Sequence, residues 1–360
     1  MLSALVFIFV LGVLVVVHEF GHFLAAKAVG VRVEKFSIGF GPVIFGKQLG
    51  ETQFVVSLLP LGGFVKLAGE SAEEAKGAAW EFNSKSLIQK FVVVFAGPLM
   101  NAFLAFIIFS FIFIVGQPTM TTRVGKVMDG TPAKEAGVLE GDKITALNGR
   151  PVALWDEVLK VIHESRADIH LTLERKGQVI EIAVKPRVKE LTGLFGKRTR
   201  TAFLGIAPSS EMVYVKSSFF KASYLGAERV ATLTGMIFYS LALMVTGALP
   251  VKDSLTGPIG IFFMTQEAAR MGLVYLFYFM GSLSVSLFVL NLLPVPVLDG
   301  GHVLFIVIER LKGSPLKVQV KERMTQGGMV ALLALMGFVI LQDVHRFSII
   351  EHVTKLFTRH

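Results

Sequence analysis

An uncharged apolar segment of membrane-spanning length limits what this chain can fold into. Residues 91–116, FVVVFAGPLMNAFLAFIIFSFIFIVG, carry no Asp, Glu, Lys or Arg. A helix of about 20 such residues spans the roughly 30 Å of hydrocarbon in a bilayer. The chain of 360 residues is 53% hydrophobic, and its mean hydropathy is +0.64. We therefore predict an α-helical polytopic membrane protein.

Two further apolar segments each have the length of one transmembrane helix. Residues 1–26 contain no Lys or Arg and one acid, Glu19, and residues 324–342 form the last apolar run. The first segment lacks the positive start and the small-residue cleavage site of a signal peptide, so we interpret it as a retained helix.

A fourth apolar segment, residues 272–308, is uncharged apart from Asp299 and the titratable His302. At about 1.5 Å per residue it is too long for one straight span. Pro294 and Pro296 predict a break within it. The four segments together predict four transmembrane helices.

Cysteine and charge content exclude several functions. The chain has no cysteine, which excludes disulfides and thiolate catalysis, so a bound metal needs His, Asp or Glu ligands. The net charge of +9 is spread along loops without a recognisable DNA-reading motif. The charge therefore indicates membrane topology, and we predict no nucleic-acid partner.

The region between the first two spans has a β-like pattern. Within about 31–68, the runs EKFSIGF, VIFGKQL, ETQFVVSL and GGFVKLAG are separated by Gly and Pro. This pattern predicts one or two β-hairpins associated with the membrane. The alternation in ETQFVVS indicates an edge strand, so we predict that Phe54, Val55, Val56 and Ser57 bind an extended substrate by β-addition.

Residues 119–208 have the pattern of an inserted α/β module. Turn signals separate short strands in TPAKEAGVLEGDKITALNG, and the helix ALWDEVLKVIHES and two more strands follow. The module resembles a PDZ domain of the bacterial protease type. AFLGIAP, residues 202–208, resembles the peptide-carboxylate loop and strand of that type, which would make the domain circularly permuted.

The predicted domain plan has four parts. Residues 1–118 form the first part of the membrane core, 119–208 the PDZ domain, 209–270 amphipathic or interfacial linker helices, and 271–360 the second part of the core. Within the linker, residues 222–249 are also apolar enough for a weak span.

HEFGH in the first span is an H-E-x-x-H motif. On a helix, His18 and His22 lie one turn apart and can bind one zinc ion, with Glu19 placed to take a proton from zinc-bound water. Zinc lowers the pKa of such water to about 7. The alternative is that the two histidines only pair with buried polar groups, but ionisable residues inside a membrane are functional by default.

The third metal ligand must come from another segment. Asp299 and His302 both lie in an apolar span, and spacing does not choose between them.

Three separated motifs carry a family resemblance that covers nearly the whole chain. HEFGH, AGPLMN (residues 96–101) and NLLPVPVLDG (residues 291–300), in this order, resemble the site-2 protease family of intramembrane zinc metalloproteases, in its bacterial RseP/RasP type. The resemblance implies Zn²⁺ as cofactor, Asp299 as third ligand and Asn291 as a substrate contact. Some members carry two PDZ domains, whereas this chain has room for one.

The resemblance also implies a substrate class. The family cleaves transmembrane segments of single-span membrane proteins that an upstream site-1-type protease has already clipped, such as anti-sigma factors, and remnant signal peptides. The alternative is a zinc-containing membrane scaffold or transporter that presents a PDZ domain. A transporter would be expected to show internal repeats and paired broken helices, whereas this sequence has one broken span and no repeat.

Several polar or small residues near these motifs have structural interpretations. We interpret Asn101 as an interhelical hydrogen-bonding residue, Gly97–Pro98 as a close-packing kink, and His302 as a packing residue or a partner of a ligand.

Basic residues predict the orientation in a bacterial cytoplasmic (inner) membrane. The loop 27–90 holds eight Lys or Arg and the loop 309–323 holds five, which places both in the cytoplasm. The N-terminus and the PDZ domain are then outside, and the active site lies in the bilayer toward the cytoplasmic side. A full crossing by residues 222–249 would move Asp299 to the outer face, so we predict an interfacial or re-entrant helix there.

Overall fold

The structure is a computed structural model that describes residues 2–71, 74–165, 167–192 and 198–347. Its internal contacts divide the chain into two units. We call the unit formed by residues 1–111, 220–242 and 250–360 the membrane unit, and the unit formed by residues 112–219 and 243–249 the β-rich unit.

Helices dominate the described part of the membrane unit. Its helices are α1 (Leu2–Ala28), α2 (Leu87–Val115), α5 (Phe219–Val245), α6 (Val251–Ser254), α7 (Pro258–Met271), α8 (Leu273–Asn291), α9 (Asp299–Lys312) and α10 (Val318–Arg346), with a 3-10 turn at Phe82–Ser84. Among the described helices, five are long and apolar enough to cross a membrane: α1, α2, α5, α8 and α10. The predicted break is confirmed, because α8 ends at Asn291 and α9 begins at Asp299.

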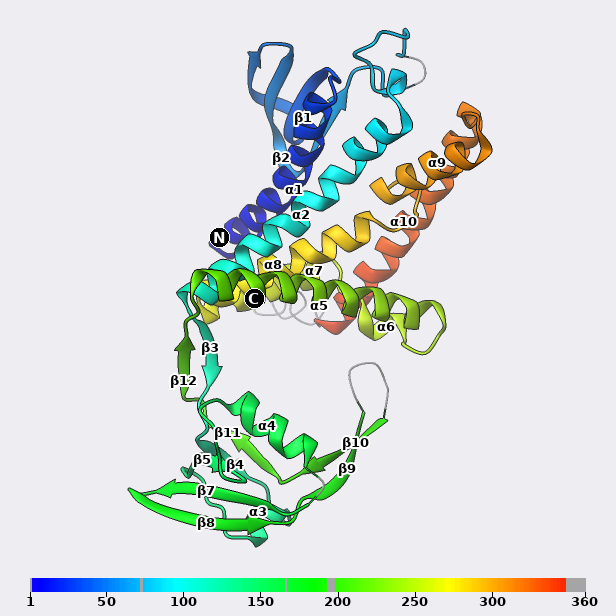
Figure 1. Cartoon of the computed structure of the whole chain (residues 1–360). Coiled ribbons are helices and arrows are strands. Elements are labelled where there is room, and N and C mark those ends of the chain that lie inside the picture. The colour runs from blue at the N-terminus through cyan, green and yellow to red at the C-terminus, as the bar shows by residue number, and fades with distance from the viewer. Residues whose placement is uncertain (1, 72–73, 166, 193–197, 348–360) are drawn as a thin grey trace, which may run out of the picture. The chain divides into compact units, whose positions relative to one another are not determined.

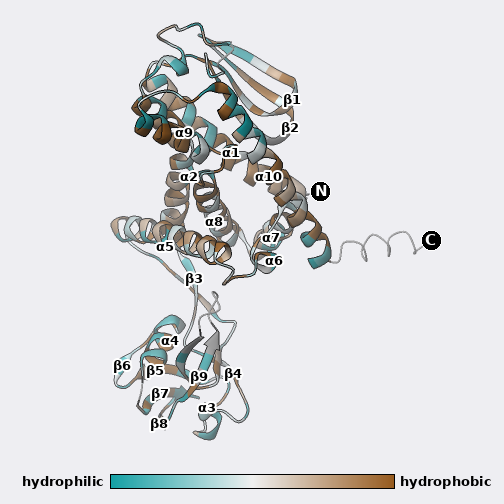
Figure 2. Cartoon of the chain, turned by 90° about the vertical axis from the view of Figure 1, so that its right-hand side faces the viewer, coloured by the Kyte–Doolittle hydropathy of each residue, from teal (hydrophilic) through white to brown (hydrophobic). Residues whose placement is uncertain are grey.

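Helix α5 differs from the other four in its direction. In Figures 1 and 2 it runs across the helices of the membrane unit instead of alongside them. Gly226 packs against Ser110 near the C-terminal end of α2, and the Arg229 guanidinium lies 5.6 Å from the centroid of the Tyr278 ring near the start of α8. The length of α5 alone would allow a span, but these two contacts lie near one end of α2 and of α8.

A long β-hairpin occupies the predicted β region. Its strands are β1 (Val33–Leu49) and β2 (Thr52–Leu67). The hairpin folds back on itself, since Phe36 of β1 lies opposite both Phe54 and Val65 of β2. The first half of β2 therefore lies between the two halves of β1.

This arrangement corrects the predicted edge strand. Phe54 lies opposite Phe36 and Lys47, and Val55 lies opposite Ser37 and Gly46, so both have β-paired neighbours on two sides. β-Addition needs an unpaired edge. Val55 and Ser57 are buried, Phe54 packs against Phe23 and Phe36, and Val56 is also paired on both sides. The predicted edge position is therefore wrong for residues 54–56, because alternation reports the faces of a strand but not its neighbours.

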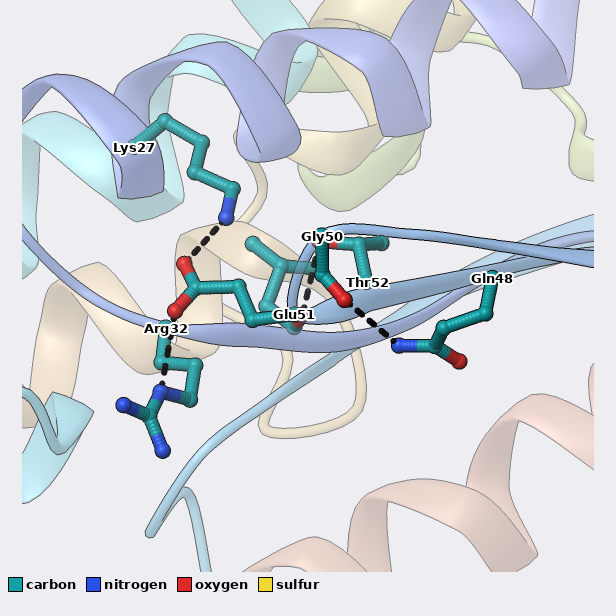
Figure 3. Close-up of polar contacts among 7 residues, drawn as sticks. Lys27, Arg32, Gln48, Gly50, Glu51 and Thr52 are labelled. Carbon is teal, nitrogen blue, oxygen red and sulfur yellow. Dashed lines mark hydrogen bonds and ion pairs between the residues drawn. The ribbon is translucent and has the colours of Figure 1, made fainter.

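Polar contacts attach the hairpin turn to the end of α1 (Figure 3). The Glu51 carboxylate accepts a hydrogen bond from the Lys27 amino group and another, of 3.0 Å, from Arg32 Nε. The hydroxyl of Thr52 donates to the Val33 carbonyl at 2.8 Å. These contacts place the sheet next to the helix turn that carries His22.

The β-rich unit contains a four-stranded antiparallel sheet with an apolar core. The sheet order is β6 (Arg150–Pro151), β5 (Lys143–Leu147), β7 (Ile169–Arg175) and β8 (Gln178–Val184). The remaining elements are the helices α3 (Pro132–Glu135) and α4 (Trp155–Glu164) and three strand pairs: β4 (Val124–Val127) with β11 (Ile206–Pro208), β9 (Arg187–Thr192) with β10 (Arg198–Phe203), and β3 (Gln117–Met120) with β12 (Met212–Val215).

Two turns of this unit follow from their residues. Asn148–Gly149 and Lys176–Gly177 all have positive φ, as a tight two-residue hairpin turn requires. They join β5 to β6 and β7 to β8. In Figure 2 this unit mixes hydrophilic and hydrophobic residues, whereas the long helices of the membrane unit are mostly hydrophobic.

Candidate metal centre

The HEFGH motif lies on α1, as predicted. His18 and His22 are one turn apart on one face of the helix, and their Nε2 atoms lie 3.2 Å from each other. Both side chains are 12% exposed.

Asp299 reaches both histidines from the first turn of α9. Its Oδ2 lies 3.1 Å from His18 Nε2, and its Oδ1 lies 3.5 Å from His22 Nε2. The glycines that follow allow this approach, because a Cβ at Gly300 would collide with the Leu293 carbonyl and one at Gly301 with the Val295 carbonyl. The break after α8 thus positions the carboxylate.

These three side chains fit a zinc ion. Zinc ligands at about 2.0–2.1 Å in a tetrahedron lie roughly 3.3 Å from one another, and the separations here are 3.1, 3.2 and 3.5 Å. Two imidazole nitrogens that face each other this closely need a proton or a cation between them. Among the described residues, His18, His22 and Asp299 form the one group whose ligand atoms gather closely enough to hold a metal ion.

His302 lies near the site but outside this group. It lines the same cavity and packs edge-on against Phe305, with ring centroids 6.2 Å apart. Of the two candidates for third ligand, the geometry favours Asp299.

Glu19 and Asn291 line a cavity of about 630 Å³ together with the three candidate ligands. The cavity wall includes Val65 of β2, and Gly63 lies close to Glu19, since a Cβ at Gly63 would be 3.5 Å from Glu19 Cγ. None of the residues 54–57 belongs to the described cavity wall. The second half of β2, not the first, lies beside the candidate centre.

Helix α2 contacts both histidines through positions spaced by one turn. The Val93 carbonyl lies 2.9 Å from His22 Nδ1, and the Asn101 Nδ2 lies 3.3 Å from His18 Nδ1. Between them, a Cβ at Gly97 would lie 2.7 Å from His22 Cδ2. We call Val93, Gly97 and Asn101 the α2 stripe.

The sequence alone did not predict the contacts of the α2 stripe with the histidines. Asn101 does bond across helices, as predicted, but its partner is a candidate ligand. The sequence feature that could have indicated these contacts is the four-residue spacing of Gly97 and Asn101, which matches the spacing of His18 and His22.

His18, Glu19 and His22 lie on the long apolar helix α1, and Asp299 reaches them from the shorter helix α9. This candidate centre has the ligand types of a zinc metalloprotease and is set in a membrane protein. The chain belongs to peptidase family M50, whose family model matches residues 6–335.

Curated relatives match over nearly their whole length. A putative zinc metalloprotease of Clostridium acetobutylicum is 32% identical, over 92% of this chain and 94% of its own. Metalloprotease MmpA of Caulobacter vibrioides is 30% identical, over 98% and 97%. Regulator of sigma-W protease RasP of Bacillus subtilis is 29% identical, over 96% and 98%.

A solved PDZ domain of an SdrC-like protein from Listeria innocua matches 25% of this chain and 96% of that domain. Its identity of 22% and TM-score of 0.20 are too low to establish the fold of the β-rich unit.

The resemblance to the site-2 protease family is thereby confirmed. The chain is a multi-pass membrane zinc metalloprotease of the site-2 protease type. Membership in a peptidase family selects the protease over the scaffold or transporter that the sequence left open.

Proposed function

We propose that this protein is an intramembrane endopeptidase in which His18, His22 and Asp299 hold the zinc ion. The observation that carries this proposal is the convergence of three ligand atoms, within 4.8 Å of one another, where the span-length helix α1 meets the first turn of α9. The apolar helices around the cavity suit a substrate that is itself a transmembrane segment.

Glu19 is the general base in this proposal. Zinc, when bound, polarises a water molecule and the scissile carbonyl. Glu19 lies one residue after His18, lines the same cavity and is not among the three metal ligands, so its carboxylate is free to take the proton of the attacking water and pass it to the leaving amine.

We further propose that residues 63–66 of β2 bind the substrate as an extended strand. Among the described strands, this segment pairs with β1 on one side only, and it lies beside Glu19. A substrate strand added here would have its peptide groups at the catalytic carboxylate. Asn291, at the end of α8, is the proposed contact on the opposite part of the cavity wall.

Proline at Val65 tests this position, because proline removes the backbone N–H, which donates to the Glu19 carboxylate at this edge of β2. We expect Val65→Pro to reduce cleavage strongly, whereas Val56→Pro, between two paired neighbours, should disturb folding instead. Retained cleavage in folded Val65→Pro would exclude strand addition at this edge.

The proposed topology has four spans: α1, α2, α8 and α10, with α5 at the outer surface. His18 and His22 lie near the end of α1, and α8 ends near Asp299, so α1 and α8 run in the same direction. If α5 crossed, the 14 residues of α7, about 21 Å long, would have to return the chain. Reporter fusions at Val251 should show an extracytoplasmic location; a cytoplasmic one would exclude this topology.

The proposed substrates are single-span membrane proteins of the bacterial inner membrane that an upstream protease has already clipped, such as anti-sigma factors, and remnant signal peptides. The name of the B. subtilis relative, Regulator of sigma-W protease, supports this class. In this proposal the β-rich unit is an extracytoplasmic PDZ domain that either excludes uncut substrates or receives a new C-terminus. Deleting residues 121–188 separates the two, since loss of a filter permits cleavage of intact substrates and loss of a receptor reduces cleavage.

Glu19→Gln tests the enzymatic proposal. The purified variant should keep zinc, because the amide replaces a residue that is not a ligand, and should lose cleavage of a single-span substrate in detergent or vesicles. His18→Ala is the matched comparison and should lose both. Unchanged cleavage by Glu19→Gln would exclude Glu19 as the base.

A further inference from the structure

Asn101 occupies an unusual position in the α2 stripe. Asn101 is fully buried. Its side-chain amide lies against Nδ1 of His18, the ring nitrogen that points away from Asp299. Its Oδ1 atom is buried and has no hydrogen-bond partner among the residues that the structure describes. The Asn101 amide that contacts His18 through Nδ2 therefore also carries an oxygen, Oδ1, to which no described group donates.

The chemistry of His18 specifies what this amide has to do. For Nε2 to offer a lone pair to a metal, the neutral imidazole must carry its proton on Nδ1. If the amide donated to Nδ1 instead, the proton would be on Nε2, which points at His22 and Asp299. A half-turn of the amide exchanges its oxygen and nitrogen and places Oδ1 next to Nδ1.

We propose that Asn101 is a positioning residue: its Oδ1 accepts the Nδ1–H of His18 and so holds the tautomer whose Nε2 faces the metal. This inference rests on the proposed ligand role of His18. His22 has the equivalent arrangement, because its Nδ1 lies 2.9 Å from the Val93 carbonyl. One helix thus supplies an oxygen acceptor to each imidazole, from positions two turns apart.

A hydrogen bond to its backbone also holds Asn101 in place. The buried hydroxyl of Ser284, on α8, donates to the Asn101 backbone carbonyl at 2.7 Å. Partners of this kind orient metal ligands and typically contribute 10–100-fold to metal affinity.

Two substitutions separate an acceptor from a space-filling residue. Asn101→Asp keeps acceptor oxygens at the same reach, whereas Asn101→Leu keeps a similar volume without them. In the purified full-length protein, chelator competition should show zinc affinity within a few fold of wild type, or tighter, for the Asp variant, and about 10–100-fold weaker for the Leu variant. The d–d spectrum of Co²⁺ in the site should be unchanged for Asp and altered for Leu.

Ser110→Ala is the matched control. Ser110 is another buried residue of α2 whose hydroxyl has no partner among the described residues, and it lies away from the histidines. This variant should bind zinc as the wild type does.

Wild-type zinc affinity in Asn101→Leu, or an Asp variant weakened as much as Leu, would overturn the proposal. If the Leu variant fails to fold, the Asp variant decides alone, since a donor role for Asn101 requires it to lose affinity at least tenfold. His18→Ala shows which of the two proposals fails. If His18→Ala keeps wild-type zinc affinity, the proposed ligand set is wrong. If His18→Ala loses zinc affinity but Asn101→Leu does not, only the positioning role is refuted.

Discussion

Both units bury apolar side chains, but they differ in which polar side chains they bury and in how much apolar surface their helices and strands expose. In the β-rich unit most of the fully buried side chains are apolar, as at Ile144, Leu147 and Leu171. In the membrane unit, Asn101 and Ser284 are fully buried, while large apolar side chains are exposed on the long helices, as at Ile88 (70%), Phe103 (50%) and Leu341 (65%).

This difference follows from the solvent of each unit. In water, removing apolar surface stabilises a fold by about 25 cal/mol per Å². In a bilayer the lipid is as apolar as leucine, so close packing at small residues and hydrogen bonds between helices hold the bundle together. The membrane unit can therefore place its polar side chains where the chemistry needs them, with glycines providing the space.

Gly97→Ala should break this arrangement most completely. The added methyl group would overlap the His22 ring, which would have to turn away from Asp299. Because the displaced atoms are at the end of a flexible side chain, the fold should survive. We expect zinc affinity to fall by at least 100-fold and cleavage to be lost, measured by chelator competition and a substrate assay.

Gly12→Ala is the control for that substitution. Gly12 lies on α1, and no described atom outside its neighbourhood comes within 4 Å of an added Cβ. This variant should keep zinc affinity and cleavage. Wild-type zinc affinity in Gly97→Ala would mean that the ring has more room than the α2 stripe allows.

The parts of this centre that local spacing encodes could be predicted from the sequence. His18 and His22 lie four residues apart, and the helix period alone places them on one face. The prolines before Asp299 also predict a break. Whether Asp299 or His302 completes the centre depended on how that break aims the first turn of α9, which no local pattern specifies.

The remaining contacts depend on neighbours that are distant in the sequence. Asn101 meets His18 across 83 residues, and the four-residue spacing on α2 does not by itself identify α1 as the helix that this face meets. The alternation in β2 predicted a strand, but the fold of the hairpin decided that Val55 is enclosed and that Val65 is at the edge. Burial in a membrane helix is likewise not encoded by hydrophobicity.

Leu171→Ala should sharpen the comparison from the other unit. Leu171 is fully buried in the apolar core of the β-rich unit, so truncation should cost about 2–5 kcal/mol of that unit's stability. Hydrogen exchange of the full-length protein should show faster exchange in β5, β7 and β8, with zinc affinity unchanged.

Val179→Ala, at a position 72% exposed on the adjacent strand, should change exchange little. A loss of zinc affinity in Leu171→Ala would show that the two units do not keep their stability and chemistry separate.

Asp142→Asn should produce the smallest effect, and its pH dependence identifies the cause. Asp142 is the buried charged residue among the described residues of the β-rich unit, with a side chain 1% exposed and an ion pair to Arg175 at 2.7 Å. Burial alone would raise the pKa of Asp142, but the hydrogen bonds from Arg175 and the Leu139 amide outweigh it and hold the pKa below its usual value.

Because the pKa is lower in the folded state, the ionised carboxylate stabilises this unit above pH about 4, and the stabilisation is lost as pH falls through the folded-state pKa. Hydrogen exchange near β5 and β7 should show Asp142→Asn less stable than wild type by about 1–3 kcal/mol at neutral pH, with the difference shrinking in acid. Glu135→Gln removes the exposed ion pair with Arg187, both side chains being 58% exposed, and should change stability little at any pH. A difference for Asp142→Asn that persists undiminished in acid would assign its effect to packing instead of to the buried charge.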